Sequence, residues 1–307
     1  AYAVLERALE RHPDDEATQL LYLRILVARN SDKAQTLGRK LLAQYPEQWE
    51  VLYLNGLMEL HDGDAKTARA HLERSIALNP GEAECYAALG NALAQLGDLA
   101  GARRSLEKAI AAGDREPEVE FDLARVLERL GLTAEAQSAL GVYQQMKKAQ
   151  TDRAQAAGEA ESGDQAIAAG DAARAAALYR QAAGIDPDEA LIFYKLGMAL
   201  DKNKDVGGEK TALEEAIRLK PDFAEAENQM GYLAVRAGDA AGAEGYLRAA
   251  VKASPSFVVA WVNLAAALTA EGKWADAKQA LARALALDPN NASARQLGQL
   301  LAQEPVQ

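Results

Sequence analysis

The chain has 307 residues, with a net charge of −11 at pH 7 and a pI of about 5.0. This acidic balance argues against nucleic acid or an anionic membrane surface as the main partner, because like charges repel. Hydrophobic residues make up 49% of the sequence and aromatic residues only 6%, and no apolar run is long enough for direct insertion into a membrane. Alanine dominates the apolar residues, and such small side chains favour helices packed on helices.

The first residues, Ala1–Pro13, resemble the second half of a helical unit whose first half is missing. They lack the charged start and apolar stretch of a signal peptide. We therefore expect the chain to be a processed or excised piece of a longer protein, which leaves its compartment open. The incomplete unit would expose an apolar edge at Tyr2, Leu5 and Leu9, through which two chains could associate.

A turn signal recurs along most of the chain at a fixed interval. The clear copies are Gly63-Asp64, Gly97-Asp98, Gly170-Asp171 and Gly238-Asp239, and Gly131, Lys204 and Gly272 occupy the same place in less regular copies. By subtraction, the successive spacings are 34, 34, 39, 34, 34 and 34 residues. A proline follows most of these turns in phase with them, at Pro80, Pro187, Pro221, Pro255 and Pro289. A fixed period of this length is typical of a solenoid built from small helical units.

One unit shows how two helices fill the interval. Amphipathic helices fit Trp49–His61 and Ala65–Leu78, with the turn Asp62-Gly63-Asp64 between them. Glycine closes the first helix because it adopts a positive φ, and the aspartate can cap the second. Asn79-Pro80 ends the second helix, because proline disfavours a helical conformation in the residue before it.

Small residues recur at the same places in successive units. A glycine lies in the middle of most first helices, and alanines lie near the start and the end of most second helices. A glycine in a helix costs about 1 kcal/mol relative to alanine, so its repetition at one register predicts that neighbouring helices touch there. Glu209 departs from this pattern, because it stands where an alanine is expected.

The interval between Gly131 and Gly170 contains five additional residues, which fall in a polar stretch without proline at 144–162. No stop signal separates the helices on either side, so we expect a longer or slightly kinked helix through Lys147–Ala157. In a continuous helix, five residues turn the following face by about 140°. The chain would then form two arms, 1–150 and 151–307, whose concave faces do not line up. The alternative is a five-residue loop that leaves the superhelix intact.

The repeated pattern resembles that of the tetratricopeptide repeat family. The family has a bulky residue near the start, Leu-Gly in mid-helix, then Gly-Asp, alanine, a bulky residue, alanine and proline. One unit matches this pattern almost completely, with Trp261, Leu264, Ala265, Leu268, Gly272, Ala277, Leu281, Ala284 and Pro289. The resemblance covers nearly the whole chain. It implies an all-α fold, an α-solenoid of about eight helix-turn-helix repeats in a right-handed superhelix, with first helices lining the concave face.

The units follow from this register. In the first arm they span about 16–48, 49–82, 83–116 and 117–150. In the second arm they span about 156–189, 190–223, 224–257 and 258–291. A final helix at 292–302 would cap the open end, which would otherwise expose an apolar face.

The resemblance also implies where a partner binds. The family's concave positions correspond in this chain to Tyr53, Leu57, Asn91, Phe121, Arg125, Tyr194, Met198, Asn228, Tyr232, Arg236, Val259 and Val262. Exposed aromatic rings supply apolar contact area, and amides can bond to the backbone of an extended peptide. The alternative is that these side chains pack against the adjacent unit. The family's two-carboxylate clamp is not reproduced, so we do not expect the C-terminal tails of chaperones as ligands.

No motif points to catalysis, a metal or a cofactor. The single cysteine, Cys85, excludes an internal disulfide and a cysteine-based metal site. His12, His61 and His71 lack the spacing of a metal-binding pair. Residues 207–211 look superficially like a phosphate-binding loop, but they follow a helix and lack the upstream glycine.

We therefore expect a non-catalytic scaffold that binds a peptide or a partner protein in its concave groove. Two alternatives remain. The chain could be the repeat arm of a larger enzyme or of a secretion or export assembly, for example in glycosyl transfer or exopolysaccharide export. It could also assemble with copies of itself.

Overall fold

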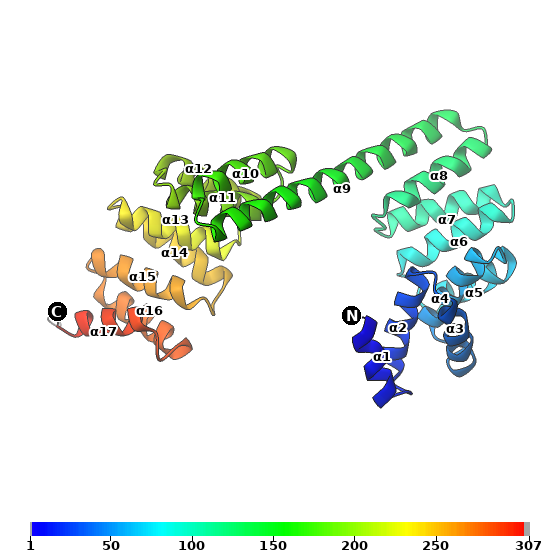
Figure 1. Ribbon diagram of the computed structural model, residues 1–307, viewed down its shortest axis with the longest axis horizontal. Coiled ribbons are helices and arrows are strands. Elements are labelled where there is room, and N and C mark those ends of the chain that lie inside the picture. Colours follow the sequence, from blue (N-terminus) through cyan, green and yellow to red (C-terminus); the bar gives the residue numbers. More distant parts are fainter. Residues whose placement is uncertain (1, 304–307) are drawn as a thin grey trace. The chain divides into compact units, whose positions relative to one another are not determined.

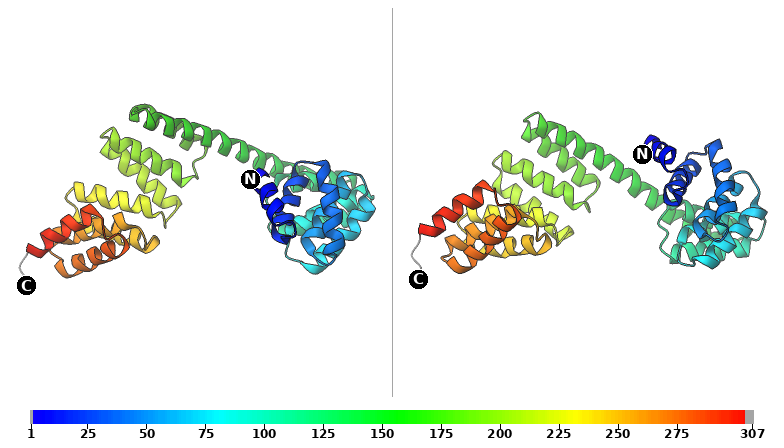
Figure 2. Two further views of the ribbon diagram at one scale, coloured as in Figure 1. Left: turned by 60° about the horizontal axis from the view of Figure 1, so that its bottom comes forward. Right: turned by 90° about the horizontal axis from the view of Figure 1, so that it is seen from below.

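The computed structural model describes residues 2–303, apart from the side chains of Tyr2 and Gln303. Within this range it contains seventeen helices and no strand. The chain divides into two compact units, Ala1–Ala149 and Gln150–Gln307. Within each unit, successive helices form antiparallel hairpins that stack in chain order (Figures 1 and 2). The α-solenoid expected from the sequence is confirmed.

Unit 1 begins with a single helix and continues with helix pairs. Its helices are α1 (Tyr2–Arg11), α2 (Glu16–Ala28), α3 (Asp32–Gln44), α4 (Trp49–His61), α5 (Ala65–Leu78), α6 (Ala83–Gln95), α7 (Leu99–Ala111), α8 (Pro117–Arg129) and the first part of α9 (Thr133–Ala168). Leu5 and Leu9 are partly buried against the core of this unit. The side chain of Tyr2, the third member of the expected apolar edge, lies outside the described residues.

Unit 2 contains the last part of α9 and ends with a single helix. Its other helices are α10 (Ala172–Ile185), α11 (Ala190–Lys202), α12 (Val206–Leu219), α13 (Ala224–Arg236), α14 (Ala240–Ala253), α15 (Val258–Ala270), α16 (Trp274–Leu287) and α17 (Ala292–Gln303). Ala294 and Leu301 of α17 are buried in the same cluster as Leu281 of α16. The expected capping helix is therefore confirmed, and it covers the last helix pair.

The recurring turn has one backbone conformation throughout. Gly63 has a φ of +83°, in the left-handed region that favours glycine. Lys204 and Asn30 adopt the same region, with φ of +62° and +48°. After the glycine turn, the Asp64 side chain accepts a hydrogen bond from the Thr67 backbone N–H at 3.1 Å and caps α5. The irregular copies of the turn thus share the positive φ of the regular ones.

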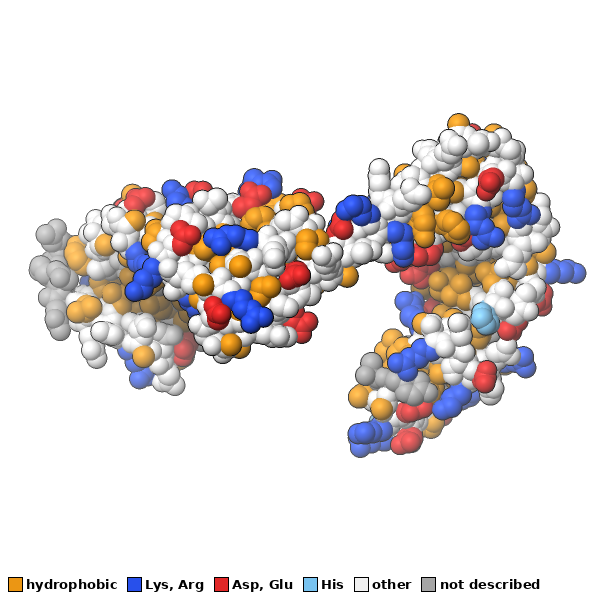
Figure 3. Space-filling model, turned by 45° about the horizontal axis from the view of Figure 1, so that its top comes forward, with side chains coloured by type: hydrophobic (Ala, Val, Ile, Leu, Met, Phe, Trp, Pro, Cys, Tyr) orange, Lys and Arg blue, Asp and Glu red, His pale blue; other side chains and the backbone are white. Residues whose placement is uncertain are grey.

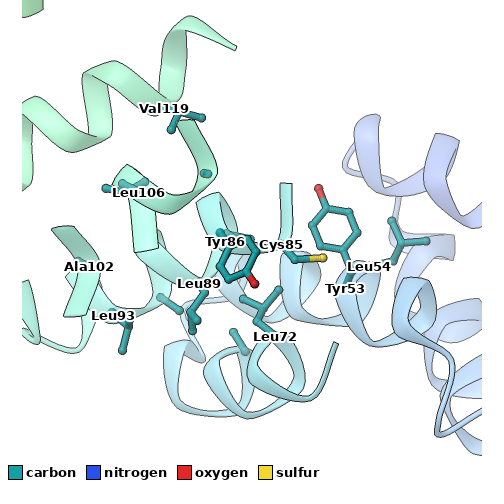
Figure 4. Close-up of a cluster of buried hydrophobic side chains, with 14 of the residues drawn as sticks. Tyr53, Leu54, Leu72, Cys85, Tyr86, Leu89, Leu93, Ala102, Leu106 and Val119 are labelled. Atoms are coloured by element: carbon teal, nitrogen blue, oxygen red, sulfur yellow. The ribbon is translucent and has the colours of Figure 1, made fainter. Parts of the chain in front are cut away.

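The mid-helix glycines lie where the two helices of a pair are closest. A Cβ atom on Gly90 of α6 would come within 2.6 Å of Leu106 Cγ of α7, and one on Gly231 of α13 within 2.5 Å of Leu247 Cγ of α14. Both leucines are completely buried. In Figure 4, Leu72, Leu89 and Leu106 reach from successive helices into one cluster. The expected helix contact at these glycines is therefore confirmed.

Residues 144–162 are helical along their whole length, as part of α9. The helix expected through Lys147–Ala157 is confirmed, and the alternative of a loop is excluded. Ala136 and Ala139, early in α9, are buried in the core of unit 1. Ala156, Ala160 and Ala166 are buried in a cluster of unit 2. The reorientation of the two concave faces stays a prediction.

Glu209 of α12 is completely buried, although its place in the repeat favours alanine. Its Oε1 accepts a hydrogen bond from Gln229 Nε2 of α13 at 2.9 Å, and its Oε2 lies 3.9 Å from an Arg236 guanidinium nitrogen. Arg236 also pairs with Asp201 at 2.6 Å. Burial raises the pKa of the Glu209 carboxyl, and the negative Asp201 acts in the same direction. One carboxylate oxygen is thus hydrogen-bonded by the neighbouring helix, whereas the buried Oε2 has no hydrogen-bond partner.

A pair of glycine substitutions tests the helix contact. Gly231→Ala should lower the free energy of unfolding by about 1–3 kcal/mol, because its methyl group would overlap the buried Leu247. The matched control is Gly245→Ala in α14, where no atom lies within 4 Å of an added Cβ. It should raise the free energy of unfolding by about 0.5–1 kcal/mol through helix propensity. Denaturant unfolding followed by circular dichroism measures both, and an equal gain in both would contradict close packing.

The buried carboxylate predicts a pH dependence. An acid whose pKa is raised by folding stabilises the protein below its unfolded pKa, and this contribution is lost as the pH rises through the folded value. Wild type should therefore lose stability relative to Glu209→Gln as the pH rises above 4.5, the ordinary value for glutamate. Urea unfolding of both proteins between pH 4 and 8 measures the difference. Parallel stability curves would show that burial does not affect the ionisation of Glu209.

Candidate binding surfaces

The first helices of unit 1 line a groove. Helix α4 contacts α2 and α6, and α6 contacts α8, so that one face of each helix is turned away from the second helices. Two hollows adjoin on these faces. The Tyr53 hollow, of about 430 Å³, lies between parts of α2, α4, α6 and the start of α8. The Arg125 hollow, of about 380 Å³, lies between the later parts of α4, α6 and α8. Both include Asn91, and we call them together the unit 1 groove.

The Tyr53 hollow has an apolar floor. Tyr53 is buried, and Leu57 and Ala87 are half-buried beside it. Burial and the nearby Glu84 carboxylate raise the pKa of the Tyr53 phenol, so it stays neutral. In the space-filling view, one face of unit 1 is hollowed, with hydrophobic side chains gathered in the hollow and charged ones around it (Figure 3). A floor of this kind can bury an apolar side chain of a ligand.

Charged residues divide the unit 1 groove into two halves. Three carboxylates, Glu84, Asp114 and Glu116, line the Tyr53 hollow. Arg24 also lines it, but its guanidinium pairs with Glu50 at 2.8 Å. The Arg125 hollow instead contains two arginines and one carboxylate, Arg125, Arg129 and Asp122. The first half is therefore acidic and the second basic.

The polar groups of the Arg125 hollow are only partly satisfied. The Arg125 guanidinium lies 3.7 Å from the Asp122 carboxylate and 5.9 Å from the centre of the Phe121 ring. The pKa of Asp122 is raised, because the effect of burial outweighs those of Asn91 and Arg125, which both lower it. Arg129 donates one hydrogen bond to the Ala94 carbonyl at 2.9 Å. Because a guanidinium has five N–H donors, both arginines retain donors for a ligand.

Phe121 does not line either hollow of the unit 1 groove. It is 39% exposed, and its ring packs on Tyr143 of α9 with ring centres 5.1 Å apart. The structure thus brings four of the five expected site residues of this unit into one groove, namely Tyr53, Leu57, Asn91 and Arg125, and places the fifth beside it.

In unit 2, several apolar side chains of the expected set lie at the surface. Tyr232 and Val259 are 44% and 50% exposed, and Leu191, at a further concave position of the register, is 46% exposed. Tyr194 is half-buried and packs on Phe223, with ring centres 5.1 Å apart. Met198 and Val262 are also half-buried.

Two expected site residues of unit 2 are engaged by the protein itself. Asn228 is buried, and its Oδ1 accepts a hydrogen bond from Asn263 Nδ2 at 2.8 Å. Arg236 bonds to Asp201 and lies over the Tyr232 ring, 5.7 Å from its centre. The alternative, in which such residues pack against the adjacent helix-turn-helix repeat, therefore holds for Asn228 and in part for Arg236.

The carboxylates of the unit 1 groove were not among the expected site residues. Asp114 and Glu116 lie in the connection between α7 and α8, where Gly113 has a φ of +100° and the Asp114 side chain accepts from the Glu116 N–H at 2.9 Å. The concave positions of the family lie on first helices, so their register does not extend to this connection. The charge run Asp114-Arg115-Glu116 was the available signal.

Within residues 2–303, no three histidine, cysteine or acidic side chains gather as a metal would require. Over the same part of the chain, no helix combines the length and the apolar character needed to cross a membrane.

Comparisons with known proteins agree with the repeat architecture. Family models described as tetratricopeptide repeat match residues 26–83, 59–120, 160–224 and 234–303, more than half of the chain. Comparison with curated proteins finds no match.

Three solved structures illustrate the similarity, each at 15% sequence identity. One is the crystal structure of the APC/C hetero-tetramer Cut9-Hcn1, with a TM-score of 0.40 over 98% of this chain and 52% of that chain, so this chain spans about half of its length. YrrB, titled a TPR protein with an unusual peptide-binding site, has a TM-score of 0.29 over 73% of this chain and 95% of that one. The C-terminal part of a TPR repeat-containing protein from Cytophaga hutchinsonii has a TM-score of 0.40 over 80% and 98%. On the family matches, the chain belongs to the tetratricopeptide repeat family.

Proposed function

We propose that the protein is a non-catalytic interaction scaffold and that its unit 1 groove holds an extended segment of a partner protein. The observation that carries this proposal is the pair of adjoining hollows that share Asn91 on the inner faces of α4, α6 and α8. Tyr53 and Leu57 supply apolar contact area there, and the Asn91 amide can donate to and accept from a peptide backbone.

The exposed apolar surface of unit 2 supports a second contact. Leu191, Tyr232 and Val259 lie on successive first helices, and each keeps a large apolar side chain exposed. Apolar surface that gathers on neighbouring elements is typical of interaction sites. A partner that covered it would gain hydrophobic stabilisation of about 25 cal/mol for each Å² of apolar surface buried. Self-association through the N-terminal edge would instead involve Leu5 and Leu9, which are already partly buried against unit 1.

A groove-filling substitution tests the first contact. Random twelve-residue peptides displayed on phage are selected on the wild-type chain, and the enriched peptides are then synthesised with a fluorescent label. Ala87→Trp places an indole in the Tyr53 hollow, so affinity in fluorescence polarisation should fall about tenfold or more. Ala111→Trp is the matched control, because Ala111 is exposed near the end of α7 and lines neither hollow.

The outcomes separate the two surfaces. Peptides that lose affinity with Tyr232→Ala, but not with Ala87→Trp, occupy unit 2. If no peptide is enriched, or if no enriched peptide loses affinity in Ala87→Trp, the proposal that the unit 1 groove holds a partner segment is wrong. Circular dichroism spectra of the variants show whether the helices remain formed.

A further inference from the structure

The charges of the unit 1 groove point to the chemistry of its occupant. We infer that it binds an extended peptide in which a lysine or arginine is separated by about four to six residues from an acidic group, with an apolar side chain between them. The inference rests on the proposed peptide-binding function and adds the charge pattern of the ligand.

The acidic half would hold the basic residue of the peptide. Glu84 and Glu116 are exposed at the entrances of α6 and α8, and Asp114 lies beside them. Carboxylates are common at helix N-termini, because they complement the helix dipole. Unlike an ordinary carboxylate at a helix N-terminus, each of these three lines a hollow. None of them forms an ion pair with a basic side chain of the described residues. A ligand cation there would meet three carboxylates, and Arg24, the arginine among the residues that line this hollow, is already paired with Glu50.

The basic half would hold the acidic group. The Arg125 side chain is 65% exposed and only loosely paired with Asp122, at 3.7 Å. Arg129 is fixed by its bond to the Ala94 carbonyl, which directs its guanidinium toward α6. Two arginines in one hollow can bind a carboxylate with charge-assisted hydrogen bonds.

The spacing of the two charges follows from helix geometry. Glu116 and Arg125 are nine residues apart along α8, which corresponds to about 14 Å at 1.5 Å per residue. An extended peptide covers that distance in about four residues at roughly 3.3 Å each. The reach of the long side chains extends the range to about six residues. Between the charges, the peptide would pass Asn91 and the apolar floor at Leu57 and Ala87.

This arrangement disfavours other classes of occupant. A uniformly acidic segment or a phosphate backbone would be repelled by Glu84, Asp114 and Glu116. A uniformly basic segment would be repelled by Arg125 and Arg129. The groove is therefore selective for charge order as well as for apolar content.

Sequences of the phage-selected peptides provide the first test. Peptides that Ala87→Trp displaces should be enriched in a basic and an acidic residue four to six positions apart, with an apolar residue between them. Enrichment in apolar residues without this charge pair would overturn the inference and leave the proposed function standing. Absence of any peptide displaced by Ala87→Trp would overturn both.

Charge reversal provides the second test. Affinity for an enriched peptide should fall about tenfold in Arg125→Glu and in the double variant Glu84→Lys, Glu116→Lys, and less in Glu84→Gln, Glu116→Gln. A peptide with its basic residue replaced by glutamate should bind the lysine double variant more tightly than wild type. Arg104→Glu, on the exposed surface of α7, is the control and should leave affinity unchanged.

The decisive measurement combines the glutamate-bearing peptide with the double variant Glu84→Lys, Glu116→Lys. If the glutamate-bearing peptide does not regain affinity on the lysine double variant, while that variant keeps its helical circular dichroism, Glu84 and Glu116 do not hold the basic residue. The same conclusion applies if wild-type affinity is insensitive to ionic strength between 20 and about 200 mM, because solvent-exposed ion pairs are screened over that range.

Discussion

The structure depends on how closely the two helices of each repeat approach one another. Gly90 faces Leu106 and Gly231 faces Leu247 across distances that leave no room for a Cβ atom. Because the leucines are completely buried, this contact fixes how one helix lies on its partner. The first helix contributes a glycine, which has no side chain, and the second contributes the branched side chain of a leucine. This contact directs the opposite faces of the first helices away from the hairpin core, where they line the unit 1 groove.

The electrostatics of the groove are set separately from this packing. Burial raises the pKa values of Tyr53 and of the half-buried Asp122, whereas Glu84 and Arg125 are exposed at the rim. Glu209 is the contrasting case, a carboxylate placed inside the packing layer. It requires Gln229 and Arg236 from the next helix, and Arg236 is thereby occupied by the protein's own carboxylates.

Periodicity predicted the fold in detail because each repeat imposes the same local demands. The glycine turns, the aspartate caps and the mid-helix glycines all act within one helix pair, so their spacing in the sequence specifies the hairpin. The site was less predictable. Leu57, Asn91 and Arg125 recur at one register, and Tyr53 lies one helical turn before Leu57. Asn228 occupies the register of Tyr53 in a later repeat, but it is bonded to Asn263. Asp114 and Glu116 enter the groove from a connection, whose path depends on the Gly113 turn and not on helical period.

Helix α9 has a consequence for how the protein unfolds. Its early alanines belong to the core of unit 1 and its later ones to a cluster of unit 2, while each core cluster is confined to a single unit. Repeat proteins are stabilised mainly by contacts between neighbours. Loss of one unit would therefore remove the packing from only one end of α9, and the helix would fray from that end while its other end stayed folded. We therefore expect thermal denaturation to proceed through partial transitions, for which a single midpoint temperature is not a well-defined quantity.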